Sequence, residues 1–122
     1  MEPFEQWHVW RRACRFSVKL YRDLAACRDQ TFRDGLTRSG LIVATRIAEG
    51  AERGSETDLM RCLSLAKGTC GEVRTRLYVG IESGLLPRGS GFALVEEARR
   101  IDRMLNSLIE SRSGRPLPRL PL

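Results

Sequence analysis

The sequence predicts an all-α protein, an antiparallel up-down-up-down four-helix bundle. Apolar residues recur at spacings of three and four through four long segments, short Gly, Pro or polar breaks separate these segments, and no alternating strand pattern competes with them. Amphipathic helices joined by short turns pack antiparallel around a shared core. The chain has 122 residues, 42% of them hydrophobic, which is enough for one such domain.

The first predicted helix runs from about Pro3 to Cys27. Pro3 suits a first helical turn, because its missing N–H would have no hydrogen-bond partner there. One apolar row is Val9, Ala13, Phe16, Leu20, Leu24 and Cys27, and a second is Trp7, Trp10, Cys14, Val18, Tyr21 and Ala25. Two buried rows predict neighbours on two sides. We expect both tryptophans in the core or at a subunit interface rather than stacked on bases.

The second predicted helix spans about Phe32 to Arg53, where Thr31 and Asp34 form a start that resembles a capping box. Small residues recur along it at positions that a neighbouring helix can approach. They are Gly40, Ala44, Ala48 and Gly50. Because glycine lowers helix propensity by about 1 kcal/mol relative to alanine, these positions predict close backbone packing.

The third predicted helix begins at Ser55, directly after Gly54 ends the second, and Asp58 is placed to bond back to the Ser55 cap. It runs to about residue 83 and stops at Gly84. Its apolar seam is Leu59, Leu63, Ala66, Cys70, Val73, Leu77 and Ile81. The alternating spacings of four and three predict a buried seam along the whole helix.

The fourth predicted helix occupies about residues 90–111, with a similar seam at Leu94, Ala98, Ile101, Leu105 and Leu108. The bundle is therefore expected to fill residues 1–111. Residues 112–122 contain three prolines, three arginines and no acid. That composition predicts a disordered, Pro/Arg-rich tail.

Positive charge is concentrated on one side of the first helix. The chain carries 21 basic and 15 acidic residues, a net charge of +6 that favours polyanionic partners. The basic stripe follows Glu5 and consists of His8, Arg11, Arg12, Arg15, Lys19 and Arg22. Like charges at these spacings repel by roughly a few tenths of a kcal/mol each, so such a stripe is unusual for a plain solvated face. We predict that Arg11, Arg12, Arg15, Lys19 and Arg22 bind nucleic acid.

The fourth helix gives a contrast, because its charged residues mix signs and Glu96 is spaced to pair with Arg100. We interpret that surface as an ordinary solvated face. Charge alone does not prove nucleic-acid binding, so a protein-only scaffold that docks an acidic protein partner stays open as the alternative.

Signatures of enzymes, metals and membranes are missing from the sequence. It has no phosphate-binding loop, no H-E-x-x-H, no G-x-S-x-G and no Cys-x-x-Cys pair, and His8 is its single histidine. We expect no enzymatic activity, no metal and no cofactor, and reduced structural cysteines. No apolar run approaches the roughly 20 residues that cross a bilayer, and no signal peptide is evident, so we expect a cytoplasmic protein.

Two motifs at the second and third helices carry a family resemblance. The chain reads I-A-E-G-x-x-R from Ile47 to Arg53 and A-x-G-T-x-x-E from Ala66 to Glu72, after an aromatic-rich first helix. This resembles the bacterial four-helix-bundle family encoded in intervening sequences of 23S ribosomal RNA genes. It is also similar to the accessory variability determinants of diversity-generating retroelements. The resemblance covers roughly residues 4–109.

The resemblance implies a ring-like homopentamer with a basic surface and no established enzymatic activity. Five copies would multiply the charge of one subunit and its attraction for RNA or DNA. The retroelement proteins imply a reverse transcriptase as a further partner. The residues that match the family motifs are Glu49, Gly50, Arg53, Gly68 and Glu72. We interpret them as structural, with the glycines allowing close helix contact and the charged residues forming a polar network at the bundle end. We expect Glu49 and Glu72 to form ion pairs with Arg46, Arg53 or Arg76.

Overall fold

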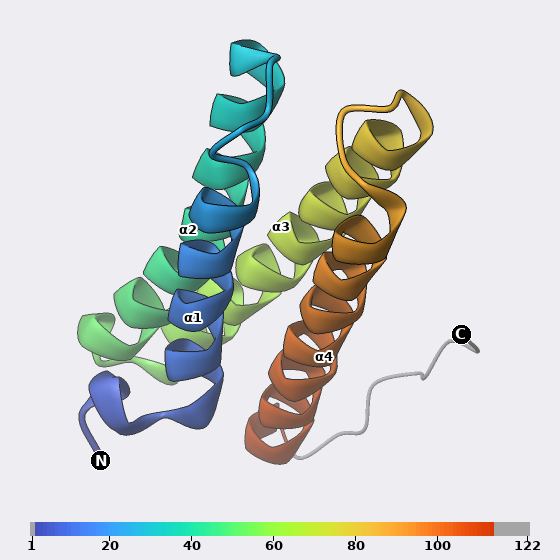
Figure 1. Cartoon of the computed structure of the whole chain (residues 1–122). Helices are drawn as coiled ribbons and strands as arrows, with labels where there is room; N and C mark the ends of the chain where they lie inside the picture. Colours follow the sequence, from blue (N-terminus) through green and yellow to red (C-terminus); the bar gives the residue numbers. More distant parts are fainter. Residues whose placement is uncertain (1, 114–122) are drawn as a thin grey trace.

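The computed structural model describes residues 2–113, which form a short 3-10 helix followed by α-helices (Figure 1). The elements are η1 (Phe4–Gln6), α1 (His8–Asp23), α2 (Gln30–Arg53), α3 (Glu56–Glu82) and α4 (Arg88–Ser113). No strand occurs within this stretch. The predicted all-α four-helix bundle is therefore confirmed.

Consecutive helices run in opposite directions and lie side by side (Figure 1). α1 contacts α2 and α4, and α3 contacts the same two helices from the other side of the bundle. The start of the chain and the end of α4 lie at the same end of the molecule (Figure 1). This arrangement brings the first residues of α1 next to the last turns of α4.

The first helix is shorter than predicted and is interrupted at Trp7. Trp7 has an extended backbone with φ −73° and ψ 126°, which separates η1 from α1. Phe4 packs edge-to-face on Trp10 with ring centroids 5.1 Å apart, so η1 is held against α1. The predicted continuous helix from Pro3 is therefore wrong at its start, because the aromatic packing turns the chain before α1 begins.

The N-terminal cap of α3 is the predicted residue, whereas that of α2 is not. The side chain of Asp29 accepts a hydrogen bond from the Phe32 amide at 2.9 Å, so α2 begins before the predicted cap at Thr31. Gly54, with φ 79°, ends α2 and Ser55 caps α3 by accepting from the Asp58 amide at 3.1 Å, so both predicted boundaries are confirmed. The Asp58 carboxylate was expected to bond back to the cap but accepts from Arg61 at 2.6 Å instead. A carboxylate is at least as good an N-cap as a threonine hydroxyl, which explains the shift at α2.

Two glycines of α2 allow the close packing that the sequence predicted. A Cβ at Gly40 would collide with the side chain of Leu20 on α1, and one at Gly50 would lie 2.8 Å from the Cβ of Cys62 on α3. α2 thus approaches both neighbours at positions without side chains. The predicted seam of α3, from Leu59 to Ile81, is buried throughout.

The two apolar rows of α1 have different environments. The first row lies in the core, where Phe16 and Leu20 are at most 2% exposed. In the second row Trp10 and Cys14 are half-buried, whereas Val18 is 48% and Tyr21 is 53% exposed. The prediction of two buried rows is therefore wrong within one chain, because the second row packs against the core at Trp7, Trp10 and Cys14 but is exposed beyond them.

The predicted tail lies mostly outside the described residues. α4 continues through Arg112 to Ser113, two residues past the expected boundary at 111, and residues 114–122 are outside the described part of the chain. Among the described residues no helix is long and apolar enough to cross a membrane.

Candidate nucleic-acid interface

Three arginines of α1 are exposed on one side of the helix. Arg11, Arg15 and Arg22 have spacings of four and seven, which place them within about 40° of one another around a helix of 3.6 residues per turn. Within residues 2–113, no carboxylate lies within ion-pair distance of any of them. Their charges therefore face water and have no neutralising partner in the described structure.

Arg12 and Lys19, which the sequence placed on the same stripe, have carboxylate partners. Arg12 donates to Glu97 of α4 through Nε at 2.7 Å and Nη2 at 3.1 Å, and this hydrogen bonding raises the pKa of Arg12. Lys19 pairs with Asp23 at 3.4 Å, but its side chain is 51% exposed. Arg12 is therefore committed to holding α1 against α4, while Lys19 stays accessible beside the free arginines.

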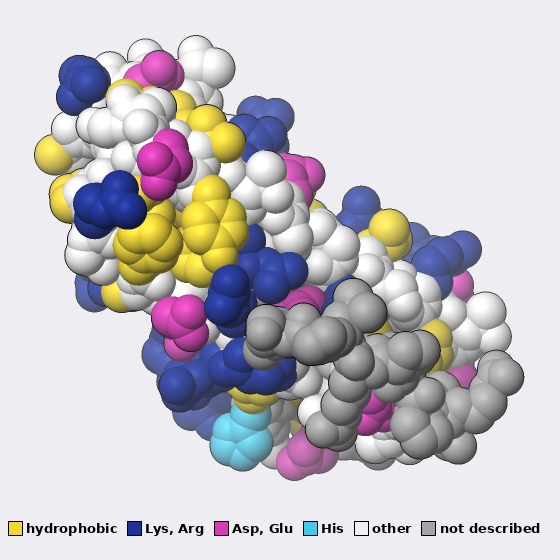
Figure 2. Space-filling model, turned by 90° about the vertical axis from the view of Figure 1, so that its right-hand side faces the viewer, with side chains coloured by type: hydrophobic (Ala, Val, Ile, Leu, Met, Phe, Trp, Pro, Cys, Tyr) yellow, Lys and Arg dark blue, Asp and Glu magenta, His cyan; other side chains and the backbone are white. Residues whose placement is uncertain are grey.

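α4 contributes two further arginines, on the surface that the mixed charges of this helix predicted to be an ordinary solvated face. Arg100 and Arg103 are exposed and make no ion pair with a described residue. The expected pair between Glu96 and Arg100 is absent, because Glu96 lies 3.6 Å from Arg99 instead. Figure 2 shows Lys and Arg side chains gathered beside the single histidine, His8.

We call Arg11, Arg15, Arg22, Arg100 and Arg103 the basic face. Its members lie on α1 and α4, two helices that contact each other. Arginine presents a planar fork of donors that suits phosphate oxygens, and it keeps its charge at any physiological pH. The basic face is therefore suited to a polyanionic partner. Spacing along α1 predicted its first three members, but nothing in the sequence showed that Arg100 would lose its acidic neighbour.

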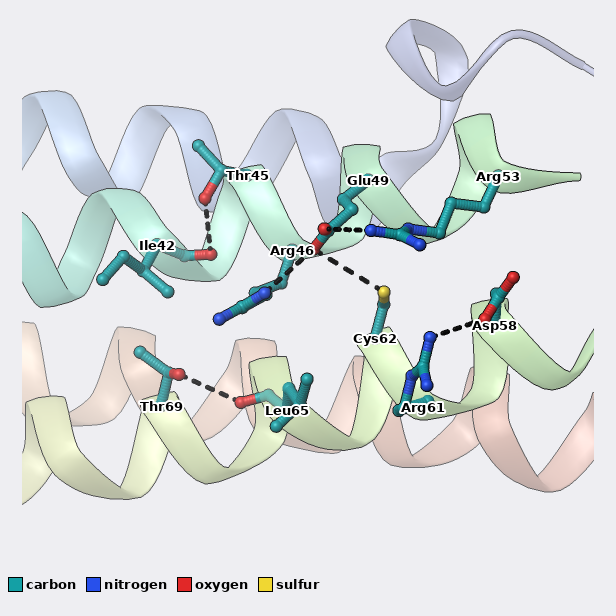
Figure 3. Close-up of polar contacts among 10 residues, drawn as sticks. All are labelled: Ile42, Thr45, Arg46, Glu49, Arg53, Asp58, Arg61, Cys62, Leu65 and Thr69. Carbon is teal, nitrogen blue, oxygen red and sulfur yellow. Dashed lines mark hydrogen bonds and ion pairs between the residues drawn. The ribbon is translucent and has the colours of Figure 1, made fainter.

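The first family motif forms a polar network between α2 and α3 (Figure 3). Glu49 accepts from Arg46 Nη1 at 2.9 Å and from Arg53 Nη2 at 3.0 Å, and these bonds lower the pKa of Glu49. The Cys62 thiol of α3 lies 3.7 Å from the same carboxylate. Gly50, next in the motif, packs against Cys62. This cluster joins two helices and leaves Glu49 with its hydrogen bonds satisfied.

In the second motif Glu72 makes hydrogen bonds, whereas Gly68 makes no close contact. Glu72 accepts from the buried Ser39 hydroxyl of α2 and from Arg76 at 3.3 Å, and the Ser39 bond is the main cause of its lowered pKa. A Cβ at Gly68 would meet no atom within 4 Å. The interpretation of Gly68 as a close-contact glycine is therefore wrong, because the surface of α3 is open there.

All four cysteines are free thiols. Cys62 and Cys70 are buried, whereas Cys14 and Cys27 are half-buried. Burial raises the pKa of Cys70 to about 12, so its thiolate is scarce at neutral pH. Among the described residues, no group of three or more His, Cys, Asp or Glu side chains is placed to hold a metal ion.

These features define a small four-helix-bundle protein with an arginine-rich face on its first and last helices. The model of the family described as 23S rRNA-intervening sequence protein matches residues 5–107, so the chain belongs to that family. This confirms the resemblance to that family, while the similarity to retroelement accessory proteins stays a prediction.

A solved structure has the same fold. It is a protein of unknown function from the S23 ribosomal protein family of Bacteroides thetaiotaomicron, with a TM-score of 0.78. The alignment covers 84% of this chain and 98% of that chain at 21% sequence identity, so the likeness concerns the fold alone. No curated protein matches the sequence.

Proposed function

We propose that the protein is a non-enzymatic, homo-oligomeric adaptor whose basic face binds nucleic acid. The observation that carries the proposal is the basic face itself, in which five exposed guanidinium groups on two contacting helices have no carboxylate partner among the described residues. Phosphate groups supply the negative charge that would neutralise these guanidinium groups. Each neutralised phosphate releases counterions, which makes binding favourable and strongly dependent on salt.

The uncovered apolar row of α1 supports self-association. Tyr21 is about half exposed, and Trp10 and Cys14 are only half-buried, and all three lie about 60–100° from Arg11 around the helix. Exposed apolar rows of this kind mark protein–protein contacts. A second copy that covers this row would repeat the basic face within one assembly, which raises the avidity for a long polyanion. The ring of five subunits that the family resemblance implies is the assembly we propose.

The test compares two triple Arg→Gln variants that remove the same charge from different faces. The first changes Arg11, Arg15 and Arg103, and the second changes Arg53, Arg61 and Arg76. Fluorescence anisotropy measures binding of a structured RNA at moderate salt, and circular dichroism checks helicity. We expect the first variant to lose at least about tenfold in affinity and the second to stay near wild type. Equal losses in the two variants would overturn the proposal.

The protein-only scaffold predicts a different result in a pull-down. A nucleic-acid adaptor loses its co-purifying partners after nuclease treatment, whereas a scaffold that docks an acidic protein retains them. A reverse transcriptase that stays bound after nuclease treatment, and is lost in the first triple variant, would identify the basic face as its docking site. Size-exclusion chromatography with light scattering measures the subunit number, and we expect Tyr21→Glu to dissociate the assembly.

A further inference from the structure

A hollow of about 680 Å³ lies between the start of the chain and the C-terminal half of α4. Its volume is within the range of about 300–1,000 Å³ found for small-molecule sites. The chain is extended at Trp7, and Gln6 and His8 on the two sides of this break line the hollow. It lies directly beside the basic face, two of whose arginines line it.

One side of the hollow is apolar and holds an indole in a fixed position. Trp7, Met104 and Leu108 line it and pack against the core. The indole Nε1 of Trp7 donates to the backbone oxygen of Glu2 at 3.3 Å. The guanidinium of Arg112 lies 5.9 Å from the centroid of the Trp7 ring and is itself bonded to Glu56 at 2.6 Å. Trp7 is thus a positioned aromatic wall, although it is only half-buried.

The other side of the hollow is mainly basic, with Glu2 as the one acidic residue among those that line the hollow. His8, Arg100 and Arg103 line it, are exposed, and make no hydrogen bond or ion pair with a described residue. An occupant that fits both sides has a flat apolar part and a negative charge. Charge complementarity excludes a basic peptide, and the positive rim makes a purely apolar occupant a poor match.

We infer that the hollow takes one unpaired nucleotide of the nucleic acid bound on the basic face. The base lies against Met104 and the part of Trp7 that Arg112 leaves exposed, which revises the expectation that neither tryptophan stacks on a base, and its phosphate meets Arg100 and Arg103. Aromatic side chains that stack on bases favour unpaired nucleotides without selecting a sequence. This inference rests on the proposed function and adds to it a preference for strands with an exposed base.

Three RNA hairpins with the same stem test the inference. The first is blunt, the second carries one unpaired 3′ nucleotide, and the third carries the same overhang without its base. We expect the full chain to bind the second hairpin about tenfold more tightly than the first, and the abasic hairpin to bind like the blunt one. An abasic overhang that binds as tightly as the complete one would show recognition of an added phosphate only and would overturn the inference.

Filling the hollow removes the preference without changing any charge. Ser107 lines the hollow and is exposed, so Ser107→Phe places a ring in the space. Ser64→Phe on the exposed side of α3 is the matched control. We expect Ser107→Phe to bind all three hairpins like the blunt one, and the control to keep the preference. A preference that survives in Ser107→Phe rules out the hollow and leaves the proposed function intact, whereas failure of wild type to bind any hairpin removes both.

Discussion

The face formed by α2 and α3 and the basic face of α1 and α4 are both rich in arginine, but most arginines of α2 and α3 have acidic partners, whereas those of the basic face have none among the described residues. On α2 and α3, Glu49 holds Arg46 and Arg53, and Arg61 lies 2.6 Å from Asp58. On the basic face no described carboxylate pairs with an arginine. On α1 no acid lies three or four residues from Arg11, Arg15 or Arg22, and on α4 Glu96 pairs with Arg99 and leaves Arg100 without a partner among the described residues. The positions of the acids, more than the number of arginines, therefore decide which surface is available to a polyanion.

The salt dependence of RNA binding should show the largest difference between the two faces. Removing three phosphate contacts from duplex RNA should lower the slope of log affinity against log salt by about 2 to 3. We expect this change in the variant of Arg11, Arg15 and Arg103. The matched variant of Arg53, Arg61 and Arg76 should keep the wild-type slope. Titrations at several salt concentrations measure both, and an equal change in slope would contradict the comparison.

A second test concerns the packing that positions the paired arginines. Gly50→Val places a side chain against Cys62, where a Cβ would already lie 2.8 Å away, so we expect a loss of about 2 kcal/mol in the free energy of unfolding. Gly68→Val meets open space on α3 and gains a few tenths of a kcal/mol from helix propensity, by a rough estimate. Urea unfolding of both variants measures the difference. Similar stabilities would contradict the close approach of α2 and α3.

Much of the fold could be predicted because helical periodicity records which residues face the core. Every residue of the predicted α3 seam is buried, and Ser55 caps α3 as expected. The interruption at Trp7 was not predicted, because it depends on Phe4 packing on Trp10 across a turn. Spacing along a helix contains no information on such a contact.

The candidate site was predicted only in part, for a related reason. Spacing gave the free arginines of α1, but it could not show that Arg12 has a partner 85 residues away in Glu97. It also could not decide whether Glu96 pairs with Arg99 or Arg100, since both lie within reach along one helix. Contacts between helices, and the choice among equivalent partners within one helix, need three-dimensional coordinates.

The paired Arg12 and the unpaired Arg11 are neighbours on α1, so single substitutions can compare a paired and an unpaired arginine within one helix. We expect Arg12→Gln to lower the free energy of unfolding by about 1 kcal/mol, because it breaks the two-point bond to Glu97, and to leave RNA affinity near wild type. Arg11→Gln should weaken RNA binding and leave stability within about 0.5 kcal/mol. Thermal unfolding and anisotropy on the two single variants measure both effects. The reverse pattern would show that Arg12 can leave Glu97 to bind phosphate.

The smallest expected effect is a dependence on pH that belongs to the face of α2 and α3. The hydrogen bonds from Arg46 and Arg53 lower the pKa of Glu49 below its ordinary value of 4.5. A group whose pKa is lowered in the folded state stabilises the fold above its ordinary pKa, and this contribution is lost as the pH falls through the lowered value. We therefore expect Glu49→Gln to melt below wild type at neutral pH and to approach wild type in acid.

Arg11→Gln is the control for this test, because Arg11 makes no ion pair with a described carboxylate. Its removal should leave the pH dependence of the melting temperature unchanged between neutral and acidic pH. Melting temperatures of the three proteins from neutral pH to below 4.5 measure the effect, and added salt should reduce it, since the Glu49 pairs are solvent-accessible. A constant gap between Glu49→Gln and wild type at every pH would assign the loss to packing near Cys62. Glu49 would then stabilise the fold by filling space between α2 and α3 and not by its charge. The two faces would then differ only in where their unpaired arginines lie.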